Sequence, residues 1–167
     1  MKILFFISFI ILFSCSSKID NKNQQNTSIK EIVVIYNKGI YSYYLIEGKL
    51  IVENYDNISN NYFKISEKNI MKLTDLYYDN NINEKSKNIE IVVNKNTYLN
   101  MPTTEIDYYI YFENGTVQHF YLQKDNEQNP LDYFKYRKYK NFIIEIDQVI
   151  ISLDKKYNFN KSDIIRI

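Results

Sequence analysis

The chain has 167 residues, and its 21 lysines and arginines against 20 aspartates and glutamates give a formal net charge of +1. This balance gives no electrostatic reason to expect nucleic acid as a partner. The single cysteine excludes an intramolecular disulfide framework, and the single histidine excludes a histidine-based metal set.

The first element in chain order is an apolar run from Ile3 to Phe13, preceded by Lys2 and interrupted by Ser8. A helix of this length covers roughly 16 Å, which is too short for a bilayer core of ~30 Å. A positive residue, a short apolar stretch and a small residue at its exit are typical of a secretory signal peptide. We therefore predict that residues 1–14 are a signal peptide.

The residues that end this segment, Leu12-Phe13-Ser14-Cys15, resemble the lipobox of bacterial lipoproteins. The resemblance implies that Cys15 becomes the acylated first residue of the mature chain. Two or three acyl chains anchor a protein durably, because each buried methylene contributes ~0.8 kcal/mol. The expected location is therefore the cell envelope, with the lipid on Cys15 in a bacterial membrane. Ser16, in place of an acidic residue, favours the outer membrane if the cell has two membranes.

The next segment, 15–29, is polar and is predicted to be a flexible tether with a reach of about 20 Å. A single domain is expected over 30–160. Residues 161–167 are expected to be a C-terminal tail or a short edge strand.

Short runs of strand-forming residues open the domain at 31–36, 40–46 and 50–55. Turns containing glycine separate them at 37–39 and 47–49, which predicts an antiparallel meander.

The apolar period then changes, and a helix is predicted from Glu67 to about Tyr78 with Ser66 as its N-cap. The apolar run 89–93 is predicted to be a more central strand. The stretch around Pro102 is expected to be a loop or an edge.

Alternating residues on both sides of Asn114-Gly115 predict a hairpin with a two-residue type I′ turn. This register pairs Phe112 with Val117 and places His119 opposite Ile110. The last element is a helix over 142–157. Whether this helix begins earlier, near Asn129, or residues 133–140 form a separate piece stays open.

These elements predict an α+β fold: a single two-layer domain with an antiparallel sheet of five or six strands and two helices packed on one face. The stretches "KIS" with Leu73 and Leu76, "MPTTEIDYYIYFENG", and 142–157 resemble an uncharacterised α+β domain of small bacterial envelope lipoproteins. The resemblance implies no known activity. That domain often carries a Cys-Pro pair in its first hairpin, and its absence here removes any redox or metal role.

Helices on one face leave the other face of the sheet open to solvent or a partner. Side-chain alternation along the two hairpins assigns these candidate binding residues to the open face: Tyr44, Tyr109, Tyr111 and Phe120. Tyrosine suits interfaces because it offers a large, stiff ring with a polar tip. The alternative is that they are ordinary strand residues, supplied in number by codons rich in A and T.

No catalytic residues, metal or cofactor are predicted. His119 has no second histidine to work with and is expected to be a strand residue. The pairs Glu105/Asp107 and Glu145/Asp147 lie two residues apart, but nothing nearby pushes their pKa values apart, as an acid–base pair requires. These four carboxylates are therefore expected to be solvated.

The sequence thus predicts a non-enzymatic envelope lipoprotein that is held on the membrane through Cys15 and binds a protein or a surface polymer. Two alternatives stay open. One is a carboxylate-dependent hydrolase acting on envelope glycans, and the other is an inhibitor or immunity-type lipoprotein.

Overall fold

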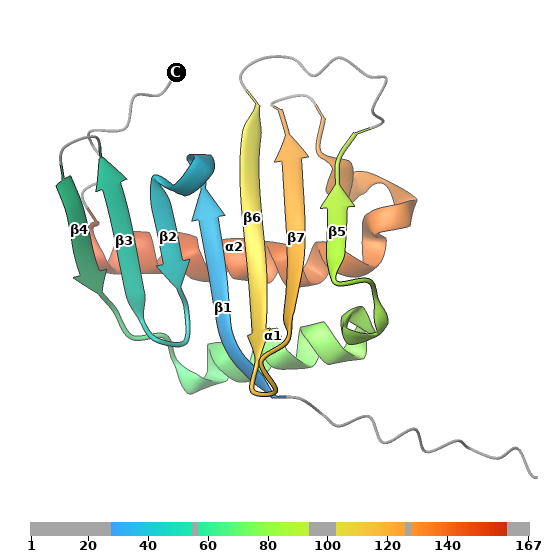
Figure 1. The fold of residues 1–167 in the computed structure, drawn as a ribbon, viewed down its shortest axis with the longest axis horizontal. Helices are drawn as coiled ribbons and strands as arrows, with labels where there is room; N and C mark the ends of the chain where they lie inside the picture. The colour runs from blue at the N-terminus through green and yellow to red at the C-terminus, as the bar shows by residue number, and fades with distance from the viewer. Residues whose placement is uncertain (1–27, 55–56, 94–102, 126–127, 160–167) are drawn as a thin grey trace, which may run out of the picture.

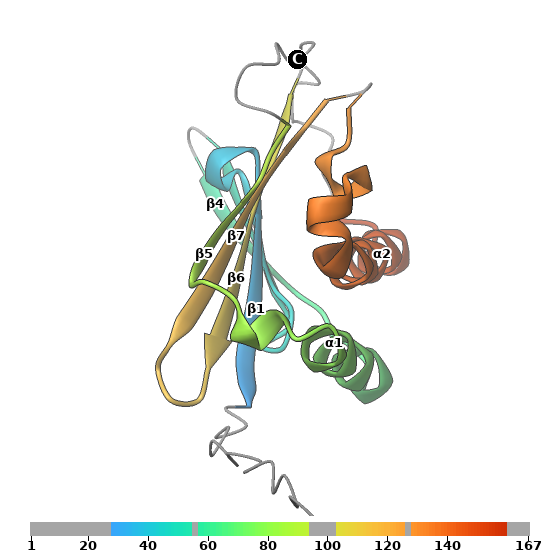
Figure 2. The ribbon, with the colours of Figure 1, turned by 90° about the vertical axis from the view of Figure 1, so that its right-hand side faces the viewer.

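The computed structural model describes residues 28–54, 57–93, 103–125 and 128–159. The described residues form one seven-stranded sheet with two helices on one of its faces (Figures 1 and 2). The strands are β1 (Ile29–Tyr36), β2 (Tyr41–Tyr44), β3 (Lys49–Asn54), β4 (Asn57–Tyr62), β5 (Asn88–Ile91), β6 (Thr104–Phe112) and β7 (Val117–Lys124). The helices are α1 (Glu67–Asp79) and α2 (Arg137–Tyr157).

The strand order is β4-β3-β2-β1-β6-β7-β5, with β1 at the centre. Neighbours are antiparallel except β5, which runs parallel to β7. The α+β class and the two helices are therefore confirmed, whereas the expected sheet of five or six antiparallel strands is wrong. Strand β4 was missed because it is polar, with only Ile58 and Tyr62 apolar. Strand β5 lies at an edge and not near the centre, because the chain crosses behind the sheet through α1 before it pairs.

The face of the sheet that meets the helices is apolar. Alternate residues of β6, from Ile106 to Phe112, are buried beneath the helices as the alternation predicts. The predicted helix 67–78 is confirmed as α1, and the side chain of its N-cap Ser66 accepts a hydrogen bond from the Asn69 N–H. Leu73 and Tyr77 form the buried part of its stripe.

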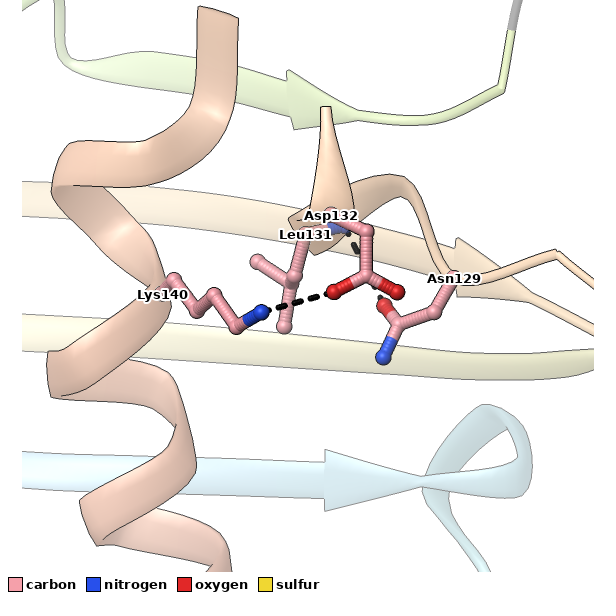
Figure 3. A network of polar contacts seen from close by, with 4 residues as sticks. All are labelled: Asn129, Leu131, Asp132 and Lys140. Atoms are coloured by element: carbon pink, nitrogen blue, oxygen red, sulfur yellow. Dashed lines mark hydrogen bonds and ion pairs between the residues drawn. The ribbon is translucent and has the colours of Figure 1, made fainter. Parts of the chain in front are cut away.

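Helix α2 begins at Arg137, after two short 3-10 turns at Pro130–Asp132 and Phe134–Tyr136. Figure 3 shows how the first turn is held. The Asn129 side chain accepts a hydrogen bond from the Leu131 N–H at 3.1 Å, and Lys140 Nζ lies 2.7 Å from Asp132 Oδ1. Leu131 is 3% exposed and belongs to the hydrophobic core. Neither alternative for 129–140 holds, because 130–136 contain two 3-10 turns packed against α2, whereas 137–140 already belong to α2 itself.

Tyrosine hydroxyl groups from the sheet bond to carboxylates of α2. Tyr36 and Tyr108 each donate to Asp147 at 3.2 Å, and Tyr43 donates to Asp154 at 2.6 Å. Burial raises the pKa of the Asp147 carboxyl above its ordinary value, although the nearby Lys124 and the two hydroxyl groups oppose this shift. The expectation that Asp147 is solvated is therefore wrong.

The second carboxylate of that helical pair, Glu145, is also engaged. It forms an ion pair with Lys72 of α1, and its side chain is 12% exposed. The contact joins the two helices across the layer that they share, so the expectation of a solvated Glu145 is also wrong.

The hairpin between β6 and β7 closes with a longer loop than predicted. Tyr111 pairs with Val117, and the Phe112 N–H donates to the Thr116 carbonyl, so the loop comprises Glu113–Gly115. Gly115 has φ +79°, whereas Asn114 is not in the left-handed region. A three-residue loop with glycine in this conformation is a common alternative to the two-residue turn. The extra residue shifts the register of β7 by one position.

Candidate functional site

The face of the sheet away from the helices is turned toward the viewer in Figure 1, and no described helix covers it. Its centre is a row of directly paired residues on neighbouring strands. Val33 of β1 lies opposite Tyr44 of β2 on one side and opposite Tyr109 of β6 on the other. Val33 is only 4% exposed although it lies on the open face. Neighbouring side chains therefore cover Val33 on this face.

The row continues into β7 through a stacked pair of rings. Tyr109 lies directly opposite His119, and the two ring centroids are 4.4 Å apart with an interplanar angle of 11°. His119 Nε2 lies 2.7 Å from Asp107 Oδ1. Burial, followed by the charge of Asp107 and the neighbouring Tyr111, raises the pKa of the Tyr109 hydroxyl. The Asp107–His119 pair thus orients the imidazole ring on which Tyr109 is stacked.

The predicted environment of these residues needs two corrections. His119 lies opposite Tyr109 and not opposite Ile110. Glu105 and Asp107 share the open face, as a spacing of two residues in a strand requires, but neither is simply solvated. Asp107 bonds to His119, and Glu105 Oε2 lies 3.8 Å from Lys38 Nζ.

A shallow hollow of about 460 Å³ lies beside this row. Its lining residues come from β1, β2, β6 and the turn after β2: Lys30, Glu31, Val33, Tyr44, Ile46, Glu47 and Tyr111. Val33 and Ile46 supply aliphatic surface, and Tyr44 and Tyr111 supply rings from either side of β1. Lys30 and Glu47 add opposite charges. Such a hollow offers ring-stacking surface together with polar groups that can form hydrogen bonds.

The Glu31 carboxylate holds the turn after β2 in place beside this hollow. Its Oε1 accepts hydrogen bonds from the N–H groups of Ile32 at 2.8 Å and Ile46 at 2.7 Å, and its Oε2 accepts from the Glu47 N–H at 2.8 Å. These bonds attach the turn after β2 to the central strand. The carboxylate therefore fixes one wall of the hollow, and both of its oxygens are engaged.

Three of the four predicted binding residues lie together on the open face. Tyr44 and Tyr111 line the hollow, and the Tyr109 ring centroid is 6.4 Å from that of Tyr111. Phe120 does not belong to this group, and its prediction is wrong. It is 0% exposed and lies on the helix face of the sheet, where its ring centroid is 5.7 Å from that of Tyr139.

The predicted two-residue turn would also have placed Gln118 opposite Tyr111, on the open face. The register shift pairs it with Ile110 instead and buries it. Gln118 is 4% exposed and accepts a hydrogen bond from the Tyr77 hydroxyl at 2.6 Å. Sequence reasoning missed the stacking of Tyr109 on His119 because it depends on the exact register of the β6–β7 hairpin. It missed the anchoring role of Glu31 because that depends on side-chain hydrogen bonds to the turn after β2. The alternation that placed Tyr109 and Asp107 on one face was the available signal.

Cys15, the predicted lipidation residue, lies outside the described residues. Within the described ranges, no group of three or more His, Cys, Asp or Glu side chains could hold a metal ion. In the same part of the chain, no helix is both long and apolar enough to cross a membrane. No protein-family model, curated protein or solved structure matches the chain.

Proposed function

We propose that this protein is a lipid-anchored component of a bacterial cell envelope that binds a protein or a surface polymer through the open face of its sheet. The anchor is Cys15, at the end of the segment that resembles a lipobox. The polar segment between Cys15 and the start of β1 at Ile29 is the proposed tether, with an expected reach of about 20 Å from the membrane.

One observation carries the binding proposal: Tyr44, Tyr109 and Tyr111 lie together on the uncovered face, beside a hollow that two of them line. Tyr111 is 37% exposed, so part of its ring is available to a ligand. Tyrosine loses little conformational freedom on binding and contributes both apolar area and a hydroxyl group. Its enrichment at binding hot spots follows from these properties.

A hydrolase is the second candidate, because Glu31 and Glu47 line the same hollow. Catalysis by two carboxyl groups needs one of them to exchange a proton with the substrate. Both oxygens of Glu31 already accept hydrogen bonds from backbone N–H groups. This arrangement favours a structural Glu31 and a protein that binds without catalysis. An inhibitor or immunity-type protein is one form of such binding.

The test is crosslinking in intact cells, followed by identification of the partner, with wild type and the double variant Tyr109→Ser/Tyr111→Ser. We expect the double variant to lose the crosslinks while its circular dichroism and melting curve stay nearly unchanged. The matched control is Ile151→Ser, because Ile151 is an exposed apolar residue on α2, away from the open face. Crosslinks that persist in the double variant and disappear in the control would contradict the proposal.

A further inference from the structure

Among the described residues, strand β4 lies at one edge of the sheet and lacks the features that normally prevent pairing with another chain. Edge strands present unpaired N–H and C=O groups, and proteins usually protect them with charges, prolines, bulges or short length. β4 pairs with β3 over all six of its residues in regular register, and it contains neither a charged residue nor a proline. The opposite edge, β5, has four residues and carries the exposed Glu90. The two edges are therefore protected to different degrees.

Hydrogen bonding shows which backbone groups of β4 face outward. The Phe63 N–H, directly after the strand, donates to the Gly48 carbonyl at 2.8 Å and therefore points toward β3. In an antiparallel pair the direction alternates from residue to residue. The backbone groups of Ile58, Asn60 and Tyr62 therefore point away from the sheet.

The side chains of these three residues share the open face, because they lie opposite alternate residues of β3 from Lys49 to Glu53. Ile58 is 66% exposed and Tyr62 is 69% exposed, so most of the surface of both side chains is available to a neighbour. They lie two residues before and two residues after Asn60. The strand is therefore self-complementary about Asn60 in both its backbone groups and its side chains.

We propose that β4 pairs antiparallel with β4 of a second copy of this chain, with the two-fold axis at Asn60. In this register Ile58 of each copy lies opposite Tyr62 of the other, so both exposed apolar side chains gain a neighbour. The outward-facing residues form three pairs, which together make about six backbone hydrogen bonds. The contact is isologous and closes at two copies. It joins the two sheets and presents both open faces on the same side.

Sedimentation velocity over a dilution series tests the dimer, with the mature chain 15–167 carrying Cys15→Ala, so that neither a lipid nor the apolar run 3–13 can drive association. We expect this protein to form dimers and Asn60→Pro to sediment as a monomer. Proline is tolerated at this position because the Asn60 N–H points away from β3. Ile58→Lys is a second variant at an exposed position and should also be monomeric. A monomer without either substitution, or a dimer that survives both, overturns the proposal.

Disulfide trapping in the same background tests the register. Across the axis, the two Cα atoms of residue 60 lie about 5.5 Å apart, which is within the range of a disulfide. The two Cα atoms of residue 58 are separated by four residues along the strands, or roughly 13 Å. We therefore expect Asn60→Cys to form a disulfide-linked dimer under mild oxidation, and Ile58→Cys to form none. Equal trapping of both variants, or trapping of Ile58→Cys alone, contradicts the register.

Discussion

Gly48 lies in the turn between β2 and β3, and Gly115 lies in the loop between β6 and β7. The two glycines form a matched pair that tests the geometry of these two turns. Their φ angles are +77° and +79°, so an alanine at either position meets the same backbone penalty of roughly 1–2 kcal/mol. At Gly115 an added Cβ has nothing within 4 Å. The penalty should therefore be the whole effect of Gly115→Ala, and Gly115→Val should cost more than about 1 kcal/mol for the same reason.

At Gly48 the added Cβ would lie 2.2 Å from the carbonyl oxygen of Phe63. The backbone of Phe63 cannot move away freely, because its N–H bonds to the Gly48 carbonyl and its ring is buried beside Tyr43 and Tyr157. A lost hydrogen bond costs about 1 kcal/mol, and overpacking costs about 1–3 kcal/mol more. Together with the backbone penalty, Gly48→Ala should therefore lower the free energy of unfolding by about 3–6 kcal/mol.

Urea unfolding of both variants, with the slope of the transition compared to wild type, measures this difference. Gly48→Ala should cost at least about twice as much as Gly115→Ala, with the slope unchanged in both. Equal losses would refute the close contact between the turn after β2 and the end of β4.

Three further predictions concern the core, a buried carboxyl group and the anchor. Phe120→Ala should lower the free energy of unfolding by about 3–5 kcal/mol, because it leaves a cavity in the core. Tyr111→Ala, on the open face, should cost far less. Similar costs for the two variants in urea unfolding would mean that Phe120 is not in the core. Burial raises the pKa of the Asp147 carboxyl group. The contribution of this group to the free energy of unfolding is therefore complete below its ordinary pKa of 3.8 and is lost as the pH rises through the raised pKa. Wild type should therefore lose stability relative to Asp147→Asn as the pH rises from about 4 to 7, and a difference that is flat with pH would contradict the burial of this carboxyl group. In cells, wild type should incorporate labelled palmitate and fractionate with membranes, whereas Cys15→Ala should do neither; equal labelling would exclude the anchor.

The sequence predicted correctly those elements that depend only on residues close together in the chain. Helix α1 followed from its apolar spacing and from Ser66, whose side chain caps it. The alternation along β6 correctly separated Tyr108, which is buried, from Tyr109 on the open face. In both cases the information lies within one helix or one strand, so no knowledge of the rest of the chain was needed.

The errors arise where pairing between segments decides the result. A loop one residue longer than expected moved Phe120 and Gln118 to the opposite face, because side chains alternate with a period of two. Strand β4 has a polar sequence, and pairing with β3 makes it a strand. The run 89–93 has the apolar character of a central strand, yet β5 is at the edge, since burial by the helices on one side suffices. No local pattern reports where a strand lies in the order of a sheet.

The open face of the sheet is the surface that we propose to bind a partner in the envelope. A photo-crosslinking amino acid placed at Tyr111 on this face, and in a separate strain at Ile151 on α2, compares the two sides of the domain in intact cells. Both positions are solvent-exposed, so both probes reach any molecule that touches their side. We expect a discrete crosslinked product from position 111 and none from position 151. A product from position 151 with none from position 111 would contradict the account, because binding would then occur on the helix side.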